Sequence, residues 1–200
     1  MAVGARGGEA LAKRLTEIAA RVSQPATLRV GFLESARYPN GQQVAYIAAI
    51  QEFGATINRE AGETTIYRKI SERTGDFLRG GRFVKRAKSN FATTHYVGAH
   101  VITIPPRPFF RRMIKANAPT WPADIAKLLK ATQFDAQETM RRMGEKIVKQ
   151  LRKSIQDLVD PPLAPSTIRG KGFSKPLIGG ARDSGKGGTM YNNVGMEVIT

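Results

Sequence analysis

The feature that most constrains this fold is the stretch 104–111, Ile-Pro-Pro-Arg-Pro-Phe-Phe-Arg. Each proline fixes its own φ, lacks a backbone N–H donor and disfavours the helical region for the residue before it. The chain is therefore expected to leave a strand here, run extended and enter a helix near Pro108, since proline is tolerated in a first helical turn. Phe109 and Phe110 then become large apolar anchors where that helix starts.

Two interpretations of this corner remain open. In the first, it is a strand-to-helix junction packed into the core, the usual place for large apolar side chains. In the second, Arg107, Arg111 and Arg112 face a partner while the two phenylalanines hold the corner in shape. The second interpretation makes a set of corner residues candidates for a partner interface: Arg107, Phe109, Phe110 and Arg111.

Apolar periodicity divides the chain into helices and short strands. Helical spacing of apolar residues predicts helices over 7–23, 44–53, 107–118, 121–129 and 133–158. Alternation of apolar residues predicts strands over 27–33, 64–70, 95–104 and 194–198. This mixture predicts an α+β fold, in which a small, mostly antiparallel sheet packs against helices.

The organisation of the chain follows from where these patterns are interrupted. The Asp-Pro-Pro run at 160–162 ends the longest helical pattern, and the chain after it is rich in Gly, Pro, Ser and Lys. We expect an α+β core domain over 1–160 that includes a basic β-hairpin region over 57–101. An extended C-terminal arm over 161–200, with a short final strand, is expected to follow.

The chain of 200 residues carries a formal net charge of +16, which implies an anionic partner. One basic run is Arg79, Arg82, Lys85, Arg86 and Lys88, with no acid among them and with Phe77, Phe83 and Phe91 nearby. Basic residues among aromatics can bind single-stranded nucleic acid, but they also suit a solvated hairpin. A second region, 141–153, has six cations and one acid on a predicted helix. That helix can face nucleic acid, solvent or an acidic subunit.

No residue pattern points to catalysis. There are no cysteines, so disulfides and thiolate metal sites are excluded. His95 and His100 lie five positions apart, so one strand would direct them to opposite faces and a shared metal site is not expected. Residues 180–187 are similar to a phosphate-binding loop but lack the Ser or Thr after Lys186 that would hold magnesium. We expect no catalytic residue, cofactor or metal, and therefore not an enzyme.

Nothing in the sequence predicts export or a membrane partner. Residues 1–8 contain no apolar segment of the kind found in secretory signals. No apolar run approaches the roughly 20 residues that a spanning helix needs.

Several motifs, taken in order, resemble one family. They are Val-Gly-Phe-Leu at 30–33, Val-Ala-Tyr-Ile-Ala at 44–48, Glu-Phe-Gly at 52–54, the 104–111 stretch, Met-Gly at 143–144, Ile155, Asp-Pro-Pro-Leu at 160–163, Ser-Thr-Ile at 166–168 and Lys-Pro-Leu-Ile at 175–178. This series is similar to the neck or tail-completion proteins of tailed bacteriophages, also described as head–tail connector, minor tail or virion-morphogenesis proteins. The family usually continues its Pro-Leu-Ile with Asp-Thr-Gly and a short helix; here 179–182 intervene before Asp-Ser-Gly at 183–185.

The resemblance implies a non-catalytic α+β protein that forms a ring at the head–tail junction of the virion after synthesis in the host bacterial cytoplasm. Expected partners are other copies of the chain, the portal, adaptor, tail terminator or tail tube, and DNA passing through the channel. A ring needs heterologous contacts, hence two different patches on each subunit. Members of the family often pass more directly from Glu-Phe-Gly to the proline corner, so the resemblance makes the basic β-hairpin region over 57–101 an insertion. This hairpin and the C-terminal arm are the candidates for the two patches, and Arg79, Arg82, Lys85 and Arg86 are candidates for an acidic partner. The alternative from another class is a basic nucleic-acid-binding protein.

Overall fold

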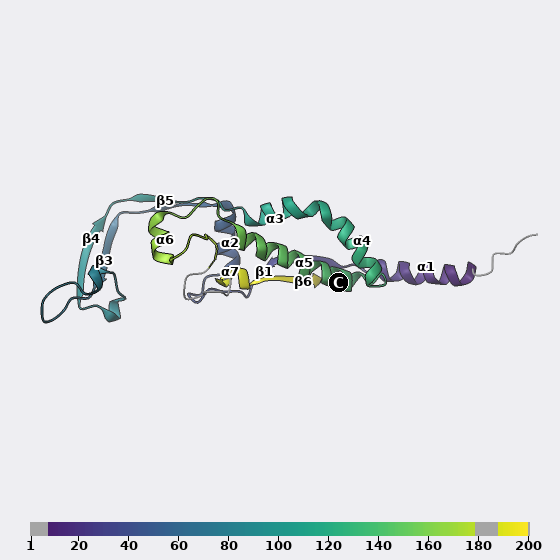
Figure 1. The fold of residues 1–200 in the computed structure, drawn as a ribbon, viewed down its shortest axis with the longest axis horizontal. Coiled ribbons are helices and arrows are strands. Elements are labelled where there is room, and N and C mark those ends of the chain that lie inside the picture. The colour runs from purple at the N-terminus through teal and green to yellow at the C-terminus, as the bar shows by residue number, and fades with distance from the viewer. Residues whose placement is uncertain (1–7, 179–187, 200) are drawn as a thin grey trace, which may run out of the picture. The chain divides into compact units, whose positions relative to one another are not determined.

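The computed structural model describes residues 8–178 and 188–199, and it has the predicted α+β composition, with helices and antiparallel strand pairs (Figure 1). The strands form three two-stranded sheets, β1 with β6, β2 with β5 and β3 with β4. The chain divides into two units: Met1–Gly54 together with Pro105–Thr200, and Ala55–Ile104. We call them the helical unit and the ribbon unit.

The helical unit is built around α5 (Ala136–Asp157), which supplies much of its core. Helical spacing of apolar residues predicts an apolar stripe along this helix. The stripe is largely confirmed, because six apolar residues at this spacing are buried: Met143, Ile147, Val148, Leu151, Ile155 and Leu158. Thr139 and Gly144 are also buried on this helix, although neither is strongly apolar. The helices α3 (Phe109–Asn117) and α4 (Trp121–Ala131) pack against α5 and are joined by a short 3-10 turn, η3 (Ala118–Thr120).

The small sheet of this unit is β1 (Thr27–Phe32) paired antiparallel with β6 (Val194–Ile199), and both strands contact α5. Gly144 is where the helix comes closest to the sheet. A Cβ placed there would overlap Met196 Sδ and would lie 2.8 Å from Leu28 Cδ1, so any larger residue forces these two side chains to shift. The predicted final strand is confirmed.

The helix α2 (Val44–Phe53) has the predicted bounds. Gly54 follows Phe53 where helices often end in a left-handed glycine, but its φ of 76° and ψ of 173° lie outside the left-handed helical region, although glycine's freedom at positive φ is still used. The helix α1 (Gly8–Val22) also forms as predicted, but none of its residues is buried.

The segment expected to be an extended arm is not extended throughout. It contains α6 (Pro165–Lys171) and α7 (Gly188–Asn192) before β6. Pro165 lies in the first turn of α6, and Gly172, at φ 83°, ends that helix in the left-handed conformation. Both are the residues that such positions favour.

The ribbon unit consists of two successive strand pairs. β2 (Ala55–Arg59) pairs with β5 (His100–Ile104), and β3 (Gly62–Arg68) pairs with β4 (Phe91–Val97), all antiparallel. The single strand predicted over 95–104 is therefore wrong, because the chain breaks at 98–99 opposite a break at 60–61. Between β3 and β4 lie two short 3-10 turns, η1 (Leu78–Gly81) and η2 (Arg86–Lys88).

Candidate interaction surfaces

The proline corner is organised by Glu52, a residue that the sequence analysis did not select. Pro108 occupies the N-cap position of α3, and no side chain there caps the helix. Instead the Glu52 carboxylate accepts hydrogen bonds from Phe110 N at 2.8 Å and Arg111 N at 3.1 Å. Arg111 Nε also donates to it, at 2.8 Å. A carboxylate of α2 thus performs the capping that a local Ser or Asp usually provides.

A sequence signal for this role exists. Val44, Ala48 and Glu52 recur every four residues, which puts all three on one helical face, and all three are buried. A carboxylate on a buried face needs hydrogen-bond donors. The glutamate on this apolar stripe therefore predicts a buried polar contact, although the spacing does not reveal that its donors lie almost sixty residues away.

Burial decides between the two interpretations of the corner for Arg107 and Phe109. Their exposed fractions are 7% and 1%, so neither side chain offers a surface to a partner. Arg107 donates to Gln51 through its backbone N–H and through a side-chain nitrogen, 3.1 Å from Gln51 Oε1. The Phe109 ring meets Phe32 edge-on, with centroids 6.2 Å apart. The expectation that Arg107 faces a partner is wrong; it builds the corner.

The other two corner candidates remain accessible. Phe110 is half-buried, and the Arg111 side chain is 58% exposed beside the ring of Phe53. An apolar groove of about 200 Å³ lies between α2 and α3 and is lined by side chains that include Ala45, Ala49 and Phe110. With Phe53, which is 68% exposed, these residues form the surface that we call the α2–α3 groove.

A second apolar surface lies on α1. Apolar residues at helical spacing form one face of this helix, and Leu11 and Leu15 on it are 61% and 57% exposed. Arg21 of the same helix donates an exposed hydrogen bond to the carbonyl of Gln133. We call this surface the α1 stripe. Because a monomer gains no burial from it, its amphipathic pattern suits contact with another chain.

The basic run forms the loop that closes the ribbon unit. The loop carries five exposed cations, and none of them forms an ion pair within the described part of the chain: Arg79, Arg82, Lys85, Arg86 and Lys88. The loop is nevertheless ordered by hydrogen bonds, among them Val84 N to Tyr67 O at 2.9 Å and the two bonds between the Asn90 side chain and the backbone of Ile70. We call residues 78–88 the ribbon tip.

Aromatic residues brace the ribbon tip. The Arg68 guanidinium lies over the rings of Phe77 and Phe83, 5.3 and 5.5 Å from their centroids. Phe77 meets Phe91 edge-on at 5.5 Å. The aromatics interleaved with the basic run therefore pin the loop, as the solvated-hairpin interpretation expects, although Phe83 remains 70% exposed.

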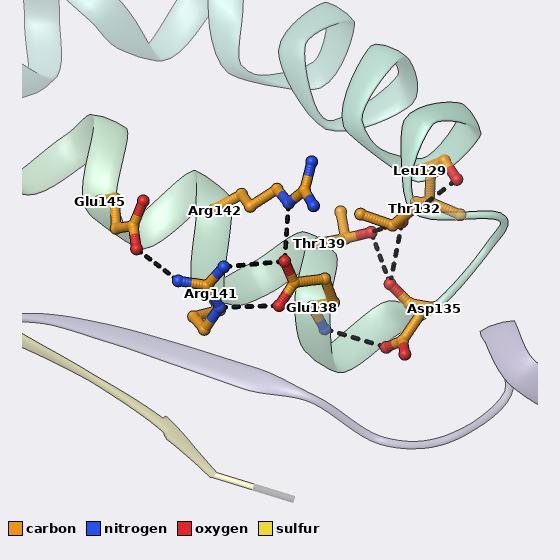
Figure 2. Close-up of polar contacts among 8 residues, drawn as sticks. All are labelled: Leu129, Thr132, Asp135, Glu138, Thr139, Arg141, Arg142 and Glu145. Carbon is orange, nitrogen blue, oxygen red and sulfur yellow. Dashed lines mark hydrogen bonds and ion pairs between the residues drawn. The ribbon is translucent and has the colours of Figure 1, made fainter.

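The basic face of α5 differs from the ribbon tip. Figure 2 shows Glu138 between Arg141 and Arg142, whose Nε atoms each donate to it at 2.7 Å, while Arg141 also pairs with Glu145. These hydrogen bonds lower the pKa of the Glu138 carboxyl to about 2 and raise the pKa of Arg141. Glu138 also donates its backbone N–H to the N-cap residue Asp135 (Figure 2).

The remaining α5 cations are also largely paired. Lys146 contacts Asp124 of α4 and lowers the pKa of that carboxyl. Lys153 pairs with Asp157 at 2.6 Å, and Arg152 donates to the carbonyl of Val194. Of the six, only Lys149 has no polar partner within the described residues.

A lysine in the C-terminal segment has a structural role. Lys171 Nζ donates to the carbonyls of Lys175, Pro176 and Ile178, at 2.9 to 3.0 Å. Burial, and then the charge of Arg107, lowers the pKa of Lys171. This residue fastens the chain after α6 to the end of that helix.

Within 8–178 and 188–199, no group of three or more His, Asp or Glu residues is placed to hold a metal ion. His95 and His100 lie on different strands, β4 and β5, and both are exposed. The loop-like motif at 180–187 lies outside the described residues. No helix in the described part is long and apolar enough to cross a membrane.

No protein-family model, curated protein or solved structure matches this chain.

Proposed function

We propose that this chain is a structural virion protein of a tailed phage, which forms a ring at the neck or tail end, completes the tail and joins it to the head. The ordered series of motifs described above supports the family. The partners are then neighbouring copies together with the portal, adaptor, tail terminator or tail tube. No catalytic step is part of this proposal.

The observation that carries the proposal is the pair of dissimilar apolar surfaces on the helical unit. The α1 stripe is the convex face of a helix, whereas the α2–α3 groove is concave. Two different surfaces on one chain suit the head-to-tail contacts that close a ring, while a two-fold dimer needs only one self-complementary surface.

Electron microscopy of particles made from a phage genome without this coding sequence tests the proposal. Filled heads and finished tails that remain separate are the expected result. Heads without any tails would move the protein to tail initiation or tube assembly, and intact infectious particles would refute a structural role.

Mass photometry of the purified chain tests the ring itself. Replacing Leu11 and Leu15 by Glu is expected to abolish oligomers, since it puts two charges on the α1 stripe. The matched control replaces Lys13 and Arg14 by Gln, which changes the net charge equally on the polar side of the same helix. Equal loss in both variants would mean that charge, not the apolar surface, drives assembly.

A second candidate, a dedicated nucleic-acid-binding protein, is favoured by the unpaired cations of the ribbon tip. It predicts tight, saturable binding of DNA by the monomer, whereas a connector binds DNA weakly.

A further inference from the structure

We infer that the ribbon tip binds the phosphate backbone of duplex DNA, weakly and without regard to sequence, and that the basic face of α5 does not. This inference names a partner for the ribbon tip; it rests on the proposed function only for the place where DNA is met, the channel of the ring.

The first step is that the two basic regions differ in free charge. On α5, Arg141, Arg142, Lys146 and Lys153 each have a carboxylate within 4 Å (Figure 2 shows the first two). On the ribbon tip no cation has one within the described residues. A phosphate that approaches α5 must compete with carboxylates already in place, while at the ribbon tip it replaces only water and counterions.

The second step is that the tip is ordered before any ligand arrives. Its backbone bonds tie it to β3 at Tyr67 and to the turn at Lys69, whose carbonyl accepts from Leu78 N at 2.9 Å. An ordered loop loses little further backbone entropy on binding, because its charged side chains are already held close together before the ligand arrives.

The third step is a strained backbone at the tip. Arg79, Gly80 and Gly81 have φ values of 56°, 65° and 73° in succession. A glycine would adopt the first of these without cost, whereas the Cβ of an arginine makes the same conformation unfavourable. Strain of this kind is common where a side chain has a binding role, and here the side chain is a cation at the turn of the loop.

The fourth step favours duplex DNA over single strands. Single-strand binders offer aromatic faces on which bases stack. In this loop the Arg68 guanidinium lies over one face of Phe77 and one face of Phe83, and Phe77 also meets Phe91 edge-on, although Phe77 and Phe83 remain 46% and 70% exposed. The faces that Arg68 occupies are not open to a stacking base, whereas all five cations are exposed, and the duplex offers them the denser array of phosphates.

The experiment measures binding of the full chain to a fluorescein-labelled 30-base-pair duplex of mixed sequence, by anisotropy, from 50 to 200 mM NaCl. Five phosphate contacts give a salt slope of about −4.5, that is, a loss of affinity of about 500-fold across this range. The expected Kd near physiological salt is on the order of 10⁻⁴ to 10⁻⁶ M.

The test variant replaces Arg82, Lys85 and Arg86 by Gln, which leaves about two contacts and a loss of only about 12-fold over the same salt range. Its affinity for the duplex is expected to fall at least tenfold at 100 mM NaCl. The matched control replaces Lys115, Lys130 and Lys149 by Gln, an equal change in net charge on α3, α4 and α5, and is expected to change affinity less than threefold. Circular dichroism checks that both variants are folded.

Four results would overturn the inference. The control variant can lose as much affinity as the test variant, which would make binding a property of the total charge. A 30-nucleotide single strand can bind more than tenfold tighter than the duplex, which would make the tip a stacking platform. Poly-glutamate can bind through the same three residues more tightly than DNA, which would assign the tip to an acidic protein. Failure of DNA binding with normal ring formation would refute this inference and leave the proposed function standing.

Discussion

Replacing Glu52 tests whether the hydrogen bonds that its carboxylate accepts from the backbone of α3, rather than its ion pair with Arg111, stabilise the corner. Glu52→Ala leaves the N–H groups of Phe110 and Arg111 without their acceptor. Each lost buried partner costs about 1–3 kcal/mol, and the half-buried position of Phe110 favours the lower end. Loss of the negative charge at the start of α3 adds about 0.3–1 kcal/mol. We therefore expect the free energy of unfolding to fall by about 3 kcal/mol.

Arg111→Ala is the discriminating comparison. It removes the ion pair but leaves both backbone bonds to Glu52 in place, and its side chain is 58% exposed. Exposed pairs contribute about 0–1 kcal/mol, so this variant should lose less than a third of what Glu52→Ala loses. Glu52→Gln should fall between them, because its amide keeps one acceptor oxygen.

Urea unfolding followed by the fluorescence of Trp121 measures these differences. Trp121 is the single tryptophan of the chain, and its indole N–H donates to Gln150 of α5 at 3.1 Å, so it reports on the helical unit. If Arg111→Ala proves as costly as Glu52→Ala, or if Glu52→Ala costs under about 1 kcal/mol, the capping argument fails.

Three further changes should alter stability by the same assay. Gly144→Val puts a side chain where Met196 and Leu28 already lie, and this overpacking should lower the free energy of unfolding by about 2–3 kcal/mol. A loss below about 0.5 kcal/mol would contradict the close approach. Asp135→Ala removes the N-cap acceptor of α5 and should cost about 1 kcal/mol, whereas Asp135→Asn should cost much less. Because the folded-state pKa of Glu138 lies near 2, below its ordinary 4.5, its contribution is present above pH 4.5 and is lost as the pH falls toward 2; Glu138→Gln should flatten that part of the stability–pH curve and change nothing in its shape above pH 6.

Local patterns predicted the elements whose burial follows their own periodicity. The bounds of α2 were predicted correctly because Pro39 and Gly41 lie shortly before its apolar run and Gly54 ends it. The α5 stripe was predicted because the residues that face the sheet recur at helical period. The final strand alternates, and its packing against α5 covers one of its faces.

The misses have identifiable causes. The prediction that α5 starts at residue 133 is wrong, because Gln133 and Phe134 adopt φ values of 53° and 65°. Neither residue is a glycine, so the sequence gives no sign of positive φ at these positions. Asp135 and Glu138 do have the spacing of an N-terminal cap, and this signal was overlooked. The strand over 95–104 was predicted whole because alternation continues through its apolar residues, although Gly98 marks the position where the chain breaks.

The candidate surfaces show where one-dimensional reasoning stops. Along the sequence, the basic face of α5 and the ribbon tip look alike, because each is a run of cations with few acids inside it. Within residues 141–153 only Glu145 supplies a carboxylate, and the other acids that pair with α5 cations lie outside this range: Glu138 one helical turn earlier, Asp157 one turn later, and Asp124 on a different helix. In a helix, residues at i±3 and i±4 can supply oppositely charged partners that a short sequence window leaves out. Counting the charges in such a window therefore overestimates the unpaired charge of a helix more than it does for a loop. It follows that the paired α5 cations contribute to the folding stability of the helical unit, while the cations of the ribbon tip contribute little to it. Neutralising the tip should then leave the urea midpoint of Trp121 unchanged, and any function that depends on those charges is separable from folding.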